Sequence, residues 1–180
     1  MEPKNYFISL NVVGSIDVFT CKEYATAVKT ALLRWSNKDG PELQAYVIMN
    51  DGLHFIVRER PSKLNHKLSY FKQYTAMKME GLIQQNRGDG RSDWLSHMLG
   101  FFGKYNRDNE HVQFWQNKNI CMVLEDTEQL NRKILYVHNL PVNQGIVMAP
   151  EHYTLSSAYP TNSRIPVVPQ TENLASFVHN

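Results

Sequence analysis

One short segment of the chain limits the possible folds more than any other. Two runs rich in apolar and β-forming residues, 43–49 (LQAYVIM) and 53–58 (LHFIVR), are separated only by Asn50, Asp51 and Gly52. An Asp-Gly pair between two such runs is a strong signal for a tight hairpin. The sequence therefore predicts two adjacent antiparallel strands here.

The segments on either side of this hairpin carry patterns of their own. Residues 6–13 (YFISLNVV) are rich in β-formers and predict a strand. Thr20 and Glu23 have the spacing of a capping box, and the apolar residues that follow predict an amphipathic helix ending near residue 37. Residues 62–85 predict the longest helix, which is also the most basic.

The second half of the chain predicts a further helix behind Ser92, a last strand within residues 114–124, and a helix over 127–139 that stops at Pro141. The element order is then β, α, β, β, α, followed by a late strand and helix. That order predicts an α+β fold of the ferredoxin-like sandwich type, in which an antiparallel sheet has helices packed on one face.

Composition sets the size and setting of this fold. A chain of 180 residues with 42% hydrophobic content fits one core; we expect a domain over residues 1–159 and an extended C-terminal tail over 160–180, where prolines recur. The net charge is only +2, so a nucleic-acid surface would require uneven placement of Lys and Arg. Two cysteines and no long apolar run predict a cytoplasmic protein that does not bind membranes.

Five segments in order resemble one known family. They are 46–57 (YVIMNDGLHFIV), 114–116 (FWQ), 136–142 (YVHNLPV), 145–147 (GIV), and 150–153 (PEHY) with the serines at 156 and 157. Together they are similar to segments of the HUH single-tyrosine transposases, and the C-terminal segments resemble the REP-associated branch. The resemblance covers roughly residues 5 to 158.

The resemblance implies a specific chemistry. In this family a tyrosine on a helix attacks a DNA phosphate and forms a 5′-phosphotyrosine link, while a divalent metal, Mg²⁺ or Mn²⁺, polarises the phosphate. Tyr136 matches the position of that nucleophile. A phenol is almost fully protonated at neutral pH, so the reaction depends on the metal site.

The family's metal ligands are only partly matched here. His54 matches the second histidine of the family's strand motif, but Gly52 stands in place of the first. Leu140 occupies the position four residues after Tyr136, where the REP-associated pattern has an asparagine. Asp51 is a possible replacement ligand, although strand alternation points it away from His54. We therefore expect metal binding to be weak or lost, and His54 has the alternative of serving as a hydrogen-bonded side chain on the sheet.

Basic residues near the long predicted helix form a candidate phosphate-contacting stripe. The alternative is an ordinary solvated helix face. The candidates are Lys63, Lys67, Lys72, Lys78, Arg87 and Arg91.

Three functions stay open at this point. The favoured hypothesis is a transposase-like protein that binds single-stranded or hairpin DNA and is impaired in metal-dependent cleavage. The second is an active transposase that cuts and rejoins single-stranded DNA through Tyr136. The third is a ferredoxin-like domain that binds a protein partner, and the oligomeric state is open in all three. The first two hypotheses require the ring of His54 to face the hydroxyl of Tyr136 across a cleft.

Overall fold

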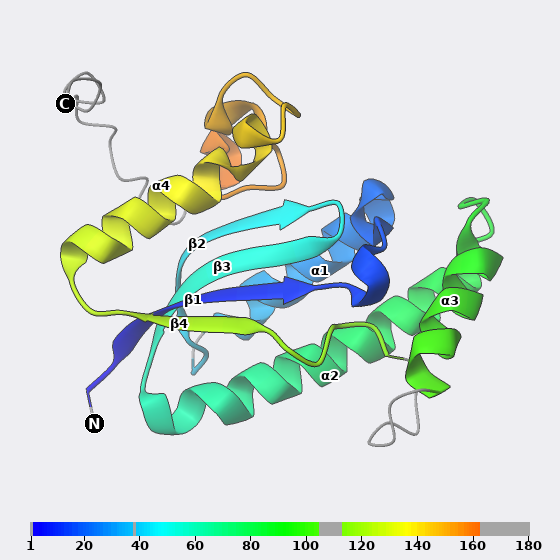
Figure 1. The fold of residues 1–180 in the computed structure, drawn as a ribbon, viewed down its shortest axis with the longest axis horizontal. Coiled ribbons are helices and arrows are strands. Elements are labelled where there is room, and N and C mark those ends of the chain that lie inside the picture. The colour runs from blue at the N-terminus through cyan, green and yellow to red at the C-terminus, as the bar shows by residue number, and fades with distance from the viewer. Residues whose placement is uncertain (1, 38, 105–112, 163–180) are drawn as a thin grey trace.

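A four-stranded antiparallel sheet forms the centre of the structure (Figure 1). The structure is a computed structural model, and it describes residues 2–37, 39–104 and 113–162. The sheet has the order β2-β3-β1-β4, so β1 lies between the predicted hairpin and the last strand. Its strands are β1 (Lys4–Asn11), β2 (Glu42–Met49), β3 (Gly52–Glu59) and β4 (Ile120–Leu124).

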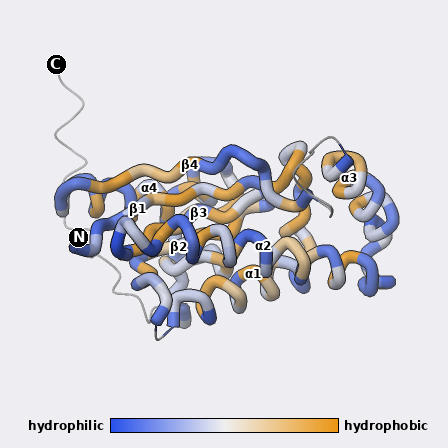
Figure 2. The backbone as a smooth tube through the Cα atoms, turned by 90° about the horizontal axis from the view of Figure 1, so that it is seen from below, coloured by the Kyte–Doolittle hydropathy of each residue, from blue (hydrophilic) through white to orange (hydrophobic). Residues whose placement is uncertain are grey.

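Helices α1 (Lys22–Trp35) and α2 (Pro61–Gln85) cover one face of the sheet, and α3 (Ser92–Lys104) packs against α2. The side chains between the sheet and these helices form the larger of two apolar clusters. Side chains alternate along each strand, so Tyr46 and Ile48 of β2 point into this larger cluster. Figure 2 shows apolar stretches along the strands, as expected for a sheet with a covered face. No helix in the described ranges is long and apolar enough to cross a bilayer.

Helix α4 (Thr127–Asn143) packs on the opposite face of the sheet from α2 (Figure 1). Its Ile134 and Val137 contact the side chains that alternate with the first set, among them Phe7, Val47 and Ile56. The predicted α+β fold with an antiparallel sheet is confirmed. The structure differs in that only α1, α2 and α3 lie on one side, because the strands are apolar on both faces and the second face also needs a cover.

Two predicted element ends are wrong. Thr20 does not cap α1 through its side chain; it lies in a 3-10 turn where its Oγ1 donates to the Asp17 carbonyl at 2.8 Å. Helix α4 runs past Pro141 to Asn143, since a proline in the last turn removes only one helix hydrogen bond and its ring is buried here. The turn that follows contains Gly145 with a φ of +70°, which favours glycine.

The predicted strand over 114–124 is shorter than expected. Only Ile120–Leu124 pairs continuously with β1, while Trp115 makes a single bridge to Val12. Trp115 is buried, and its Nε1 donates to Thr75 Oγ1 at 2.9 Å. The intervening residues are polar, so they leave the sheet rather than extend it.

The segment after α4 returns to the outer edge of β2. The backbone N–H of Ser157 donates to the Tyr46 carbonyl at 2.9 Å, and the N–H of Ile48 donates to the Leu155 carbonyl at 2.9 Å. Asn162 donates to the Thr154 carbonyl at 2.9 Å, so ordered packing extends three residues beyond the predicted boundary at 159. The rest of the predicted tail, 163–180, lies outside the described residues.

Candidate functional site

Tyr136 lies on α4 at the edge of the smaller apolar cluster, which Ile134 and Val137 form with Phe7, Val47, Ile56 and their neighbours. Its side chain is 44% exposed. Its ring meets that of Phe7 edge-on, with centroids 6.0 Å apart and an interplanar angle of 84°. Phe7 is buried on β1, so a rigid central strand positions an exposed phenol.

Lys133 lies one helical turn before Tyr136. Its Nζ is 4.6 Å from the ring centroid of Tyr136 and 4.6 Å from that of Phe7. Both distances are within the range of a cation–π interaction. Sequence reasoning missed Lys133, although its i, i+3 spacing from Tyr136 was a usable signal.

His54 lies on the central strand β3, between Ser9 of β1 and Val47 of β2. Strand alternation places its side chain on the same face as Ile56, which is the α4 face that also carries Tyr136. Its Nδ1 is buried and accepts no hydrogen bond from any described residue. Burial lowers the pKa of His54 below its usual value, against an opposing effect of the Asp51 carboxylate, so the ring is neutral at neutral pH.

Gly52 shares that face with His54 but has no space for a side chain. A Cβ at this position would lie 2.7 Å from Asn11 Oδ1 and 2.9 Å from the Leu10 carbonyl oxygen. The backbone of Gly52 does not adopt a positive φ, so the obstacle is the close approach of β1 and not strain. A histidine would not fit here without displacing the backbone of the neighbouring strand.

The third expected ligand position is also unsuitable for a metal. Leu140 is half-buried and packs against the smaller apolar cluster. Within the described ranges, no three His, Cys, Asp or Glu side chains are grouped so that they could hold a metal ion. The Asp51 carboxylate partly opposes the lowering of the His54 pKa by burial, but these two groups fall short of the three protein ligands in the family's pattern.

The predicted DNA-contacting residues of α2 lie on the opposite side of the sheet from Tyr136. Lys67 forms an ion pair with the buried Glu59. Lys72 donates to the Gln116 carbonyl at 3.2 Å, and burial lowers its pKa. Both cations therefore interact within the fold, whereas Lys63 is exposed on the surface of α2.

The remaining predicted contacts lie near the far end of α2. Arg91 is held by Asp89, with Nε 3.2 Å from Oδ1, and donates to the Asp17 carbonyl at 3.0 Å. Arg87 is exposed and Lys78 is half-buried. Of the six residues, Lys63 and Arg87 are thus the most accessible to a ligand.

His138 has a structural role on the other flank of α4. Its Nε2 lies 2.8 Å from Ser157 Oγ, and that oxygen also accepts from the Tyr46 N–H at 2.9 Å. Burial lowers the pKa of His138 to about 4. The neutral ring therefore joins α4 to the segment that covers the edge of β2.

Comparisons with known proteins show which fold this is. No protein-family model and no curated protein matches the sequence. The solved structure of a REP-associated tyrosine transposase bound to a REP hairpin is similar, with a TM-score of 0.53, 13% identity, and coverage of 97% of this chain and 91% of that one. A transposase candidate from Deinococcus radiodurans R1 has a TM-score of 0.48, 15% identity, and coverage of 77% and 92%. The chain therefore has the fold of a REP-associated tyrosine transposase.

Proposed function

We propose that the protein binds single-stranded or hairpin DNA on the α4 face and is impaired in metal-dependent cleavage of it. The observation that carries the proposal is that an accessible tyrosine occurs together with an incomplete set of metal ligands. Tyr136 is exposed beside a lysine. Gly52 has no room for a ligand, and Leu140 is packed among apolar side chains.

The surroundings of Tyr136 suit a single strand. Proteins hold unpaired DNA by combining cations near the phosphates with aromatic rings that stack on bases. Tyr136 and Lys133 supply one of each at the same point. The similarity in fold to a transposase bound to a hairpin supports the same class of ligand.

A second contact region on α2 is part of this proposal. Lys63, Lys78 and Arg87 would touch a part of the DNA other than the strand at Tyr136, because α2 lies on the opposite side of the sheet. A hairpin stem that extends past the edge of the sheet would meet this requirement.

An active transposase is the alternative. It is favoured by the placement of His54 and Tyr136 on one face and by the nearness of Asp51 to His54. In that case a metal held by His54, Asp51, waters and the DNA phosphate would promote attack by the Tyr136 phenol, forming a phosphotyrosine bond as the phosphate–oxygen bond to the leaving strand breaks.

Binding is tested with a DNA hairpin that carries a single-stranded overhang and with a blunt duplex of the same stem. We expect the overhang hairpin to bind more tightly by fluorescence anisotropy, with an affinity that falls steeply with salt. Tyr136→Ala should remove much of this preference. Tyr70→Ala is the matched control, because Tyr70 is 63% exposed on α2. Absence of salt-dependent DNA binding would favour a protein-binding domain instead.

Cleavage is tested separately with the same overhang hairpin and Mg²⁺ or Mn²⁺. A denaturing gel should show little or no covalent protein–DNA adduct for the wild-type protein. An adduct that requires metal and disappears in Tyr136→Phe would establish the active transposase. Asp51→Asn would then show whether this carboxylate replaces a missing ligand.

A further inference from the structure

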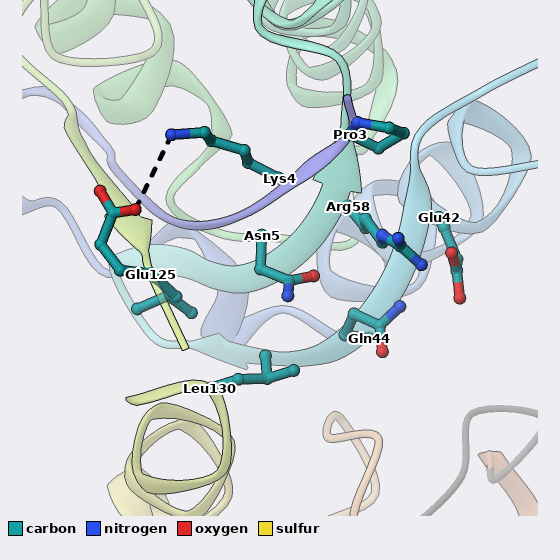
Figure 3. A pocket seen from close by; sticks show the side chains of 9 residues that line it. Pro3, Lys4, Asn5, Glu42, Gln44, Arg58, Glu125 and Leu130 are labelled. Carbon is teal, nitrogen blue, oxygen red and sulfur yellow. Dashed lines mark ion pairs between the residues drawn. The ribbon is translucent and has the colours of Figure 1, made fainter. Parts of the chain in front are cut away.

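A polar pocket of about 310 Å³ opens on the α4 face, at the end of the sheet where β1 begins (Figure 3). Asn5 lies at its centre, and Gln44 and Arg58 extend from β2 and β3 beside it. Leu130 of α4 forms an apolar wall. The volume is at the lower end of the range for ligand sites, which suits one small ring system.

The amide of Asn5 is not satisfied by the fold. Its Oδ1 is buried and accepts no hydrogen bond from the described residues. A buried acceptor without a donor loses its hydrogen bonds to water without replacing them, and such groups are rare in native structures. The cost is offset if a ligand supplies the missing donor.

Gln44 is aimed at the same pocket by an irregularity in the sheet. The register of β2 against β3 shifts between Leu43 and Ala45, which makes Gln44 the extra residue of a bulge. Bulges redirect a side chain and are common beside functional sites. Two amide groups, each with donors and an acceptor, therefore converge from different strands.

The charges around the pocket balance. Lys4 is paired with Glu125 at 3.7 Å, and Arg58 lies opposite Glu42 in the register of the sheet. Two cations and two carboxylates give no net positive charge, so a phosphate has no electrostatic preference for this pocket. A neutral ring with donors and acceptors on its edge fits both the charge and the amides, and Asn and Gln are the side chains that pair with such a base edge.

The pocket adjoins the contact between Tyr136, Phe7 and Lys133. Asn5 and Phe7 are alternate residues of β1 on one face, which separates them by roughly 7 Å. Leu130 and Tyr136 lie on one helix about 9 Å apart along its axis. A strand whose backbone lies at Tyr136 can therefore place a neighbouring base in the pocket.

We infer that this pocket binds one unpaired base of the DNA strand held at Tyr136, through the amides of Asn5 and Gln44. The inference rests on the proposed function, since it assumes that DNA lies on the α4 face. It adds to the proposed function one position at which the protein contacts a base directly. Such a contact distinguishes a base from an abasic sugar at one position only.

The test uses hairpins with a single-stranded overhang in which one abasic site is moved along the overhang one nucleotide at a time. For wild-type protein we expect a loss of affinity of roughly tenfold at one or two adjacent positions. Asn5→Leu should weaken binding of the other hairpins to about the level of the hairpin that lacks this base and leave the affinity of that hairpin unchanged, so that the dependence on position is lost. Asn65→Leu, an exposed site on α2, is the matched control and should keep it.

A second variant guards against a folding defect in Asn5→Leu. Gln44→Leu, on the half-buried bulge residue, should reduce the same position-specific loss. A flat abasic profile in wild type, or one that persists unchanged in both variants, would overturn the pocket assignment and leave the proposed function standing. Failure of the wild-type protein to bind any of the hairpins would overturn both.

Discussion

Tyr136 of α4 rests edge-on against Phe7 of β1, with the two ring centroids 6.0 Å apart. This contact joins a helix to the central strand that also pairs with His54 of β3. The exposed phenol is therefore fixed relative to the sheet, and Lys133 lies beside both rings. An exposed aromatic ring held in this way is suited to a ligand that lies across the α4 face.

The first prediction concerns the lysine at this contact. Lys133→Ala should weaken binding of the overhang hairpin by about 3- to 30-fold, because it removes a phosphate contact and a cation–π interaction. The slope of log affinity against log salt should also fall by about one. Arg132→Ala is the control, since Arg132 is the adjacent residue and forms an exposed ion pair with Glu128 at 3.7 Å. Equal losses in the two variants would point to general charge rather than to a contact at Lys133.

The second prediction concerns Gly52. Gly52→Ala should lower the free energy of unfolding by roughly 1–3 kcal/mol, because its Cβ would meet the Leu10 carbonyl oxygen at 2.9 Å. Urea denaturation measures the change. Gly81→Ala should instead be neutral or stabilising by up to about 1 kcal/mol, since nothing lies within 4 Å of a Cβ there and alanine favours a helix. Unchanged stability in Gly52→Ala would show that β1 can move away from residue 52 at little cost in free energy. A histidine could then be accommodated at this position.

The third prediction concerns pH. His138 has a folded-state pKa of about 4, below the ordinary value of 6.5. The unfolded chain binds more protons between these values, so the stabilisation by the neutral ring is complete above about pH 6.5 and is lost as the pH falls towards 4. The loss should be on the order of 2–3 kcal/mol. The free energy of unfolding, measured by urea denaturation, should change less with pH over this window in His138→Gln than in the wild-type protein. The same pH dependence in both proteins would show that His138 does not titrate as described.

The fourth prediction separates binding from folding on α2. Lys63→Glu should lower the affinity for the hairpin stem and lower stability less than Lys67→Glu does, because Lys63 is exposed and acts on the Glu59 carboxylate only through space. Lys67→Glu should lower stability, because Lys67 neutralises the buried Glu59. Thermal unfolding and anisotropy distinguish the two effects. Undiminished affinity in a folded Lys63→Glu protein would restrict DNA contact to the α4 face.

Much of the fold follows from local patterns in the sequence. The Asp-Gly turn and the apolar runs on either side determined the β2–β3 hairpin, and the spacing of apolar residues determined α2 and α4. These features depend on interactions between residues close together in the chain, which a sequence shows directly. The same local spacing predicted the helix that carries Tyr136, which is exposed at the edge of the core.

Relations between distant segments were decided only by the tertiary structure. Alternation along β2 is apolar on both sides, so the sequence by itself did not determine which face α4 would cover. The close approach of Leu10 to Gly52, the hydrogen bond from Lys72 to Gln116, and the shared pocket of Asn5 and Gln44 each join segments far apart in the chain. The sequence determined which elements form and which residue types they carry. Packing decided which of those residues are accessible for chemistry, because space and charge at one position are set by whichever segment the fold brings beside it.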